Sequence, residues 1–324
     1  MNLQEHADAV HDRSPSGGYV KHATKSSQLR VLKFGGSSVG SADAIKQVVR
    51  IVMETSQRRR VVVVVSALAR VTNLLEAIVE KGAGDPITHL ITLYRRHVET
   101  AQTLLSEPYL SSYKNILGRE LSAVIPAIRR VRQDAAADFD ADTILAAGER
   151  FSAPLIAAAL TQTGRTSTPV DASELIHVSG APDRQINDGQ TIDRVRSWYS
   201  NLNSTVVPVV TGFIGSAPCG GTVTLGRGGS DFTAALLASA LGAEVLERWT
   251  DVDGLYTADP EIDPSAKKYN VLRMEDAAFL NRADRLGMHR HTLEPLLRSC
   301  TPLHVKSFTQ PGSGTLIIPT KTKV

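Results

Sequence analysis

Residues 31–38 read Val-Leu-Lys-Phe-Gly-Gly-Ser-Ser, an apolar run that ends in two glycines and two serines. Such a run suits a short strand, and the glycines permit the tight turn that must follow it. Ser41 can cap a helix, and apolar residues recur behind it at helical spacing. These residues are Ile45, Val48, Val49 and Val52. The sequence therefore predicts strand, glycine turn and helix over residues 31–55.

The next strand is marked by an unbroken run of valines, Val61 to Val65. A continuous apolar run, in place of alternation, is typical of a strand covered on both faces in a parallel sheet. Strand-like and helix-like segments then alternate along the chain, which predicts an α/β sandwich with a mainly parallel central sheet. Further helices are expected at 134–160, 192–201 and 231–241, and further strands at 206–214, 244–250 and 303–306.

The composition is that of a folded globular protein. Of the 324 residues, 42% are hydrophobic and 21% are charged, which is enough for a sizeable core. Lys and Arg total 36 against 33 Asp and Glu, a net charge of +3. This balance does not suit a protein that coats nucleic acid or a lipid surface. We therefore expect a small-molecule substrate, and no nucleic acid or membrane as partner.

The two cysteines, Cys219 and Cys300, cannot form a disulfide framework or a four-thiolate zinc site. The scattered histidines show no metal-ligand spacing either, so no protein-held metal site is predicted. Residues 1–29 are polar and contain no apolar stretch that could serve as a signal peptide or a membrane span. We expect a disordered N-terminal tail, a folded chain behind it, and a cytoplasmic location.

The turn after the first strand has the character of a phosphate site. Gly35, Gly36 and Ser37 expose backbone N–H groups beside the positive end of a helix dipole, and the ammonium group of Lys33 is close in sequence. The segment is not a Walker A loop, which requires a longer glycine spacing followed by lysine. An ordinary strand-to-helix turn is the alternative interpretation.

A second glycine-rich turn, Leu225-Gly226-Arg227-Gly228-Gly229-Ser230-Asp231, opens the helix expected at 231–241. The arginine can form a bidentate pair with a substrate carboxylate or phosphate, and an aspartate near phosphates usually orients a cationic group. In the alternative interpretation Arg227 and Asp231 pair with each other at the helix start. If both turns are functional, they must converge on one crevice.

These two turns belong to a longer series of short motifs. Six segments, in the same order along the chain, resemble the motifs of the aspartokinases, within the amino acid kinase superfamily, and cover about residues 30–318. They are Lys33-Phe34-Gly35-Gly36-Ser37-Ser38-Val39, Val65-Ser66-Ala67 with Val71-Thr72-Asn73, Gly148-Glu149-Arg150-Phe151-Ser152, Gly212-Phe213-Ile214-Gly215, Thr224 to Asp231, and Trp249 to Pro260.

The resemblance implies a three-layer α/β/α sandwich that transfers the γ-phosphoryl group of ATP to the side-chain carboxylate of L-aspartate, giving 4-phospho-L-aspartate, with Mg²⁺ required. It implies an amino-acid-binding lobe at 30–205, a nucleotide-binding lobe at 206–318 and a C-terminal tail at 319–324. Most aspartokinases continue into ACT domains that sense lysine or threonine. We therefore expect a chain without an ACT domain and without built-in feedback, in which a homodimer is left open.

The resemblance also implies roles for individual residues. The catalytic residues would be Lys33, Gly36 and Asp231. The residues that bind the acceptor amino acid would be Ser66, Thr72, Glu149, Arg227 and Ser230. The residues that bind ATP would be Lys33, Gly35, Gly36, Ser37, Thr250, Asp251 and Tyr256. Two of these segments have plainer alternatives, since Glu149 could be a surface charge and the segment 250–254 could be an aspartate-rich turn.

The chain departs from the aspartokinase pattern at three positions, and each departure changes the charge. Glu261 stands where the family has an arginine, Leu286 stands where a lysine reaches the phosphates, and Arg70 stands where a glycine is usual. Losing cations beside a triphosphate weakens its binding in a partly desolvated site. Two alternative functions therefore stay open: a kinase of the same fold acting on another small amino acid, and a low-activity aspartokinase-like binding subunit.

Overall fold

The structure is a computed structural model that describes residues 29–80, 84–133, 135–179, 185–258, 262–277, 290–310 and 312–319. The tails expected at 1–29 and 319–324 lie outside these ranges, except for Leu29, which opens the first strand, and Pro319. The main sheet has eight strands: β1 (Leu29–Phe34), β2 (Arg60–Val65), β3 (Ser167–Val170), β4 (Val207–Thr211), β7 (Val245–Thr250), β10 (Val271–Arg273), β11 (Leu303–Ser307) and β12 (Thr315–Ile318).

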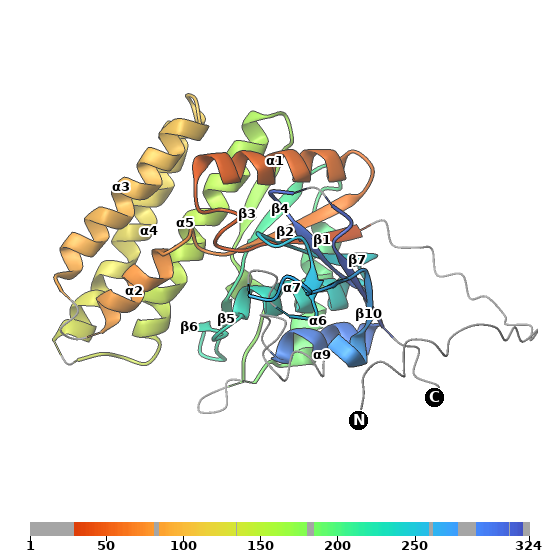
Figure 1. The fold of residues 1–324 in the computed structure, drawn as a ribbon. Helices are drawn as coiled ribbons and strands as arrows, with labels where there is room; N and C mark the ends of the chain where they lie inside the picture. The colour runs from red at the N-terminus through yellow and green to blue at the C-terminus, as the bar shows by residue number, and fades with distance from the viewer. Residues whose placement is uncertain are drawn as a thin grey trace, which may run out of the picture.

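Helices cover the sheet on both faces (Figure 1). They are α1 (Ala42–Ser56), α2 (Val71–Val79), α3 (Pro86–Leu104), α4 (Tyr109–Arg132), α5 (Asp140–Gln162), α6 (Asp188–Asn201), α7 (Gly229–Leu241) and α9 (Leu293–Ser299), with short 3₁₀ turns η1 (Ala172–Glu174) and η2 (Arg290–Thr292). Two small antiparallel pairs lie outside the main sheet: β5 (Ile214–Ser216) with β6 (Thr222–Thr224), and β8 (Leu255–Tyr256) with β9 (Lys268–Tyr269).

The strand order of the main sheet is β10-β12-β11-β7-β1-β2-β4-β3. All neighbouring pairs are parallel except β11 with β12. The prediction of a mainly parallel sheet inside an α/β sandwich is therefore confirmed. The chain leaves β1 toward β2 on one side and later returns to place β7 on the other. Such a reversal opens a crevice at the carboxyl ends of the strands, where open α/β sheets bind their ligands.

The valine run of β2 explains the layered architecture. Val61, Val63 and Val65 join one hydrophobic core, which α1 to α5 cover, whereas Val62 and Val64 join a second core, which α6, α7 and α9 cover. Successive residues of a strand point to opposite faces of the sheet. All five side chains are buried because helices cover both of these faces. The unbroken run is thus the sequence signature of a strand in the middle layer of three.

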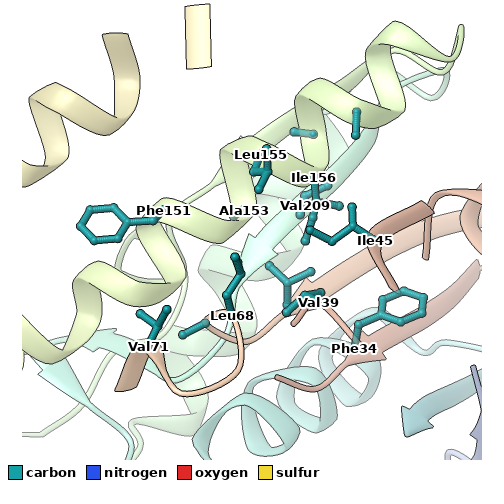
Figure 2. Close-up of a cluster of buried hydrophobic side chains, with 14 of the residues drawn as sticks. Phe34, Val39, Ile45, Leu68, Val71, Phe151, Ala153, Leu155, Ile156 and Val209 are labelled. Atoms are coloured by element: carbon teal, nitrogen blue, oxygen red, sulfur yellow. The ribbon is translucent and has the colours of Figure 1, made fainter. Parts of the chain in front are cut away.

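Helix α5 is the central element of the first core (Figure 2). Its residues Leu155 and Ile156 lie near Val209 of β4 and Ile45 of α1, whereas Phe151 packs edge-on against His97 of α3 with ring centroids 5.2 Å apart. Among the described helices α5 alone is long and apolar enough to cross a membrane, but 78% of the relevant window is buried inside the fold. That burial is typical of a core helix, and it fixes the position of every polar side chain that α5 carries.

Some predicted boundaries were wrong. The strand expected at 206–214 ends at Thr211, because the chain then turns at Phe213, whose φ is 70°, before β5 begins. The helix expected at 134–160 begins only at Asp140, because Phe139 has a left-handed backbone with a φ of 70°. Helices α2, α3, α4 and α9 were not predicted.

Candidate active site

A cavity of about 520 Å³ lies at the carboxyl end of the central strands. It is bounded by the residues that follow β1, β2 and β4 and by the start of α7. Both glycine-rich turns contribute to it, so the requirement that they converge on one crevice is met. Eight of the predicted site residues line it: Lys33, Gly36, Ser66, Thr72, Glu149, Arg227, Ser230 and Asp231.

An ion pair joins the two halves of the cavity. The Nζ atom of Lys33, near the end of β1, lies 2.7 Å from Oδ1 of Asp231 in α7, and both side chains are only 9% exposed. Nε of Arg248, on the neighbouring strand β7, donates to Oδ2 of Asp231 at 3.3 Å. Burial alone would raise the pKa of Asp231, but the charges and hydrogen bonds of Lys33 and Arg248 outweigh it and lower that pKa. Asp231 is therefore an anion that holds two cations.

This arrangement excludes the alternative pairing of Arg227 with Asp231. The carboxylate is already engaged by Lys33 and Arg248. Arg227 lies exposed on the loop before α7 and lines the cavity. Its guanidinium group is therefore available for an anionic ligand.

The second turn is shaped by close backbone packing. Gly226 and Gly228 have φ values of 73° and 74°, which a side chain would strain. A Cβ atom at Gly212 would lie 2.5 Å from Cβ of Ser230, so only glycine lets the end of β4 approach α7 this closely. Phe213 N–H donates to Oγ1 of Thr233, which fastens the turn after β4 to the first turn of α7. The start of α7 thus borders the cavity in a fixed position.

Glu149 projects from α5 into the opposite wall and is not a surface charge. It is 4% exposed, and its Oε1 accepts a hydrogen bond of 3.1 Å from the backbone N–H of Ala67. Burial raises the pKa of Glu149 to about 8, against smaller opposing effects of backbone hydrogen bonds and the charge of Lys33. The carboxyl group is therefore largely protonated at neutral pH, and a cation placed beside it would favour its ionised form.

The same helix holds the strand that leads to Arg227. Asp142, in the first turn of α5, accepts hydrogen bonds from both the backbone N–H and Oγ1 of Thr224, the last residue of β6. Two turns later Arg150 donates to Oγ1 of Thr222 at 3.1 Å and pairs with Asp171 at 2.6 Å. Helix α5 thus both carries Glu149 and fixes the base of the Arg227 loop.

The remaining predicted residues do not line this cavity. Gly35 and Ser37 lie in the turn beside it, and a Cβ at Gly35 would lie 3.5 Å from Nζ of Lys33. Thr250 ends β7, one strand away from Lys33, and its Oγ1 donates to Asp251. Tyr256 donates its hydroxyl hydrogen to Asp253, and this bond lowers the pKa of Asp253. The segment 250–256 is therefore an ordered turn at the same edge of the sheet.

Three residues that shape the site were not predicted from the sequence: Asp142, Arg248 and Phe213. A lone aspartate in a helix and a lone arginine in a strand carry no spacing signal. Phe213 was visible inside a motif, but its left-handed backbone was not. Two of the noted departures, Glu261 and Leu286, lie outside the described residues. The third, Arg70, lines the cavity with a φ of 66°.

The described residues do not form a protein-held metal site. No group of three His, Cys, Asp or Glu side chains in these ranges is placed to hold an ion. Asp231, the buried carboxylate between the two glycine turns, already holds Lys33 and Arg248. This carboxylate is therefore not available as a metal ligand.

Comparison with known proteins agrees with the geometry. The model of the Amino acid kinase family matches residues 28–307. Lysine-sensitive aspartokinase 3 of Escherichia coli is 31% identical over 303 residues, covering 92% of this chain and 65% of that protein. The chloroplastic bifunctional aspartokinase/homoserine dehydrogenase 1 of Arabidopsis thaliana is 29% identical over 317 residues, covering 96% of this chain and 34% of that protein.

Solved structures of aspartokinases also resemble this chain. Aspartokinase III of E. coli in complex with aspartate and ADP superimposes with a TM-score of 0.82 at 30% identity, covering 91% of this chain and 65% of that one. The chain spans about a third of the length of the plant relative and 65% of the bacterial one. The resemblance drawn from the six motifs is thereby confirmed. The chain belongs to the amino acid kinase family, and the relatives named here are aspartokinases.

Proposed function

We propose that this chain transfers the γ-phosphoryl group of ATP to the side-chain carboxylate of L-aspartate, forming 4-phospho-L-aspartate and ADP. The observation that carries the proposal is the single cavity in which Arg227, Glu149 and the Lys33–Asp231 pair come together. Support comes from the structure of E. coli aspartokinase III, which was solved with aspartate and ADP.

The proposed reaction needs positioning and charge neutralisation more than covalent chemistry. A carboxylate oxygen of the acceptor attacks the γ-phosphorus, a new O–P bond forms, and the bond to the ADP oxygen breaks. Because the acceptor is already an anion, no proton has to be removed. Mg²⁺, carried by the nucleotide, would neutralise phosphate charge. Lys33 and the backbone N–H groups of Gly35 and Gly36 would stabilise the charge on the transferred group.

The acceptor would be held at both ends of its amino acid moiety. Arg227 would bind the α-carboxylate in a bidentate pair, and Glu149 would accept the ammonium group. Ser66, Thr72 and Ser230 line the same cavity and would place the reacting side chain. Thr250, Asp251 and Tyr256 would contact the nucleotide from the edge that follows β7. The two exposed free thiols, Cys219 and Cys300, are in keeping with a reducing compartment such as the cytoplasm.

Hydroxamate trapping of the acyl phosphate tests the proposal directly. Purified protein, ATP, Mg²⁺ and L-aspartate should yield aspartyl hydroxamate together with a matching amount of ADP. Arg70 supplies a reason to test further acceptors, because it adds a cation to the cavity wall. Other small amino acids and dicarboxylates should therefore be compared with L-aspartate. Release of ADP with none of these acceptors would contradict a phosphotransferase function.

The raised pKa of Glu149 predicts a pH-dependent affinity for the acceptor. Only ionised Glu149 can pair with an ammonium group, so KM for the amino acid should fall as the pH rises toward about 8. Steady-state kinetics at saturating ATP would measure this. In Glu149→Gln the acceptor KM should be high and nearly independent of pH over that range. A wild-type KM that does not change with pH would contradict the assignment.

The same group links stability to pH. Because the folded-state pKa of Glu149 is about 8 and its ordinary value is 4.5, the folded protein holds the proton more tightly than the unfolded chain. Its contribution to the free energy of unfolding is fully present below pH 4.5 and is lost as the pH rises through about 8. Chemical denaturation of wild type and Glu149→Gln should therefore diverge over this interval.

The Asp142 contacts predict a selective loss of acceptor affinity. Asp142→Ala removes the acceptor of two hydrogen bonds at the base of the Arg227 loop. Because hydrogen bonds to charged groups contribute about 1.5–3 kcal/mol, we expect KM for the amino acid to rise about tenfold or more. KM for ATP should change by less than about twofold, which corresponds to a free energy well below that range.

Thr224→Val is the matched control for Asp142→Ala. It removes only the hydroxyl group and keeps the backbone N–H bond to Asp142. Its effect should be smaller than that of Asp142→Ala, and the double variant should be less impaired than the two separate effects combined. Equal losses in the KM values for ATP and the amino acid would indicate general unfolding instead.

A further inference from the structure

A second, smaller cavity lies at the opposite edge of the sheet from the candidate active site. It has a volume of about 240 Å³ and is lined by residues at the amino ends of β2 and β4 and at the end of α1. Four of the lining residues are arginines, namely Arg58, Arg59, Arg60 and Arg165, and no Asp or Glu is among the lining residues. The cavity is therefore strongly cationic, unlike the active-site cavity, in which charges of both signs meet.

Three of these four guanidinium groups have no carboxylate partner in the described part of the chain. Arg59 alone is paired, with its Nε 2.9 Å from Oε2 of Glu244. Arg60 lies over the ring of Tyr199, 4.2 Å from the ring centroid, a contact that orients the cation without neutralising it. Arg58 and Arg165 form no ion pair with an acid among the described residues. Like charges gathered in this way repel each other unless an anion lies between them.

Two buried polar atoms of the lining residues also lack partners. Neither the phenol oxygen of Tyr199 nor Nε of Arg165 has a hydrogen-bond partner among the described residues, although both atoms are buried. Buried polar groups are nearly always hydrogen-bonded, so such atoms need a ligand or an ordered water. Burial raises the pKa of Tyr199 despite the opposing charge of Arg60, which keeps the phenol protonated. Each group therefore keeps an O–H or N–H for which the described residues supply no acceptor.

Helix ends explain only part of this pattern. Helices α1, α5 and α6 end at Ser56, Gln162 and Asn201, and the partial negative charge of a helix C-terminus favours nearby cations. Arg59 accordingly donates to the backbone carbonyl of Arg58. Helix ends do not satisfy the buried donors of Tyr199 and Arg165, and they carry only about half an elementary charge each. Several positive charges remain for a ligand.

We propose that this cavity, the arginine cavity, binds a small oxyanion of the phosphate class. Guanidinium groups match the geometry of phosphate oxygens, and a phenol and a guanidinium N–H add directed donors. A volume of about 240 Å³ is below that of most pockets for nucleotides or drug-sized ligands, which begin near 300 Å³, so the ligand is inorganic phosphate or a very small phosphorylated molecule. The arginine cavity shares no lining residue with the candidate active site, and this proposal does not depend on the proposed function.

Calorimetric and thermal titration with inorganic phosphate tests this site, with sodium chloride at equal ionic strength as reference. Because phosphate should also bind at the active-site turns, the titrations are done in wild type and in Lys33→Ala. A saturable rise of the melting temperature should persist in Lys33→Ala. In that background Arg165→Gln should weaken phosphate binding about tenfold or more, the amount expected for a charge-assisted hydrogen bond.

Two further variants separate specific binding from general charge effects. Tyr199→Phe deletes one oxygen atom; it should weaken phosphate binding while leaving the phosphate-free protein at least as stable, since an unsatisfied buried hydroxyl is removed. Arg50→Gln removes one exposed cation from α1 outside the cavity and should bind phosphate as wild type does. The proposal is overturned if phosphate does not saturate, or if Arg50→Gln and Arg165→Gln lose the same affinity.

Discussion

Replacing Lys33 by alanine is expected to lower kcat by about 10²- to 10³-fold, the loss typical of removing one preorganised charge partner of a transition state. Nζ of Lys33 is held 2.7 Å from Asp231 with only 9% of the side chain exposed, so the charge is fixed before substrate arrives. Affinity for ATP should fall much less than kcat, because the lysine acts mainly on the group in transfer. Hydroxamate formation and nucleotide titration measure the two quantities separately.

Lys33→Arg is the informative control for that experiment. It preserves the charge, but a planar guanidinium group does not fit the space of a buried ammonium, so activity should stay far below wild type. Native circular dichroism spectra of both variants at the assay temperature would show that the loss of activity does not come from unfolding. Wild-type turnover in Lys33→Ala would refute the role of the first glycine turn and of its lysine.

Asp231→Ala should have the largest effect on stability, a loss of about 3–5 kcal/mol in the free energy of unfolding. The substitution removes the carboxylate that lies 2.7 Å from Nζ of Lys33 and 3.3 Å from Nε of Arg248, two cationic side chains that are only 9% and 16% exposed. Urea denaturation followed by circular dichroism would measure the change. Since the two cations keep the pKa of Asp231 low, the difference from wild type should be present at neutral pH and shrink as the pH falls below 3.8.

An exposed ion pair provides the comparison. Asp43 pairs with Lys46 on α1, and its side chain is 89% exposed. Asp43→Ala should therefore change stability little, as surface pairs usually do. Removing both partners, Lys33 and Asp231, should cost less than the sum of the single substitutions. A loss in Asp231→Ala no larger than that in Asp43→Ala would show that the buried pair does not contribute to stability.

The elements with a strong local pattern were predictable from sequence. The valine run predicted a central parallel strand, and the glycine motifs predicted the turns that precede α1 and α7, because each signal depends on residues adjacent in the chain. Helices α3 and α4 were missed for a physical reason. The buried positions of α3 are Leu93, His97 and Ala101, so its core-facing stripe includes a histidine and an alanine and gives a weak hydrophobic period.

The parts of the site that depend on distant contacts could not be predicted. Arg248 reaches Asp231 only because β7 is the neighbour of β1, with Arg248 in register with Lys33. The strand expected to continue through 214 ends at Thr211, where the chain turns at Phe213 and Gly212 packs closely on Ser230 of α7. Both outcomes depend on the strand order and on helix placement, which no local pattern encodes. The six motifs contain many of the residues that line the cavity, but the ion pairs between these residues could be seen only in the folded structure.

The position of β1 has a consequence for motion. In the order β10-β12-β11-β7-β1-β2-β4-β3, three strands lie beyond its neighbour β7 and two lie beyond its neighbour β2, and the backbone of β1 is hydrogen-bonded along both edges. Amide hydrogens of β1 should therefore be among the slowest in the protein to exchange with deuterium. Lys33 belongs to this rigid strand, so its side chain loses little conformational entropy when a nucleotide binds. Most of the entropic cost of placing this reacting group is therefore incurred during folding.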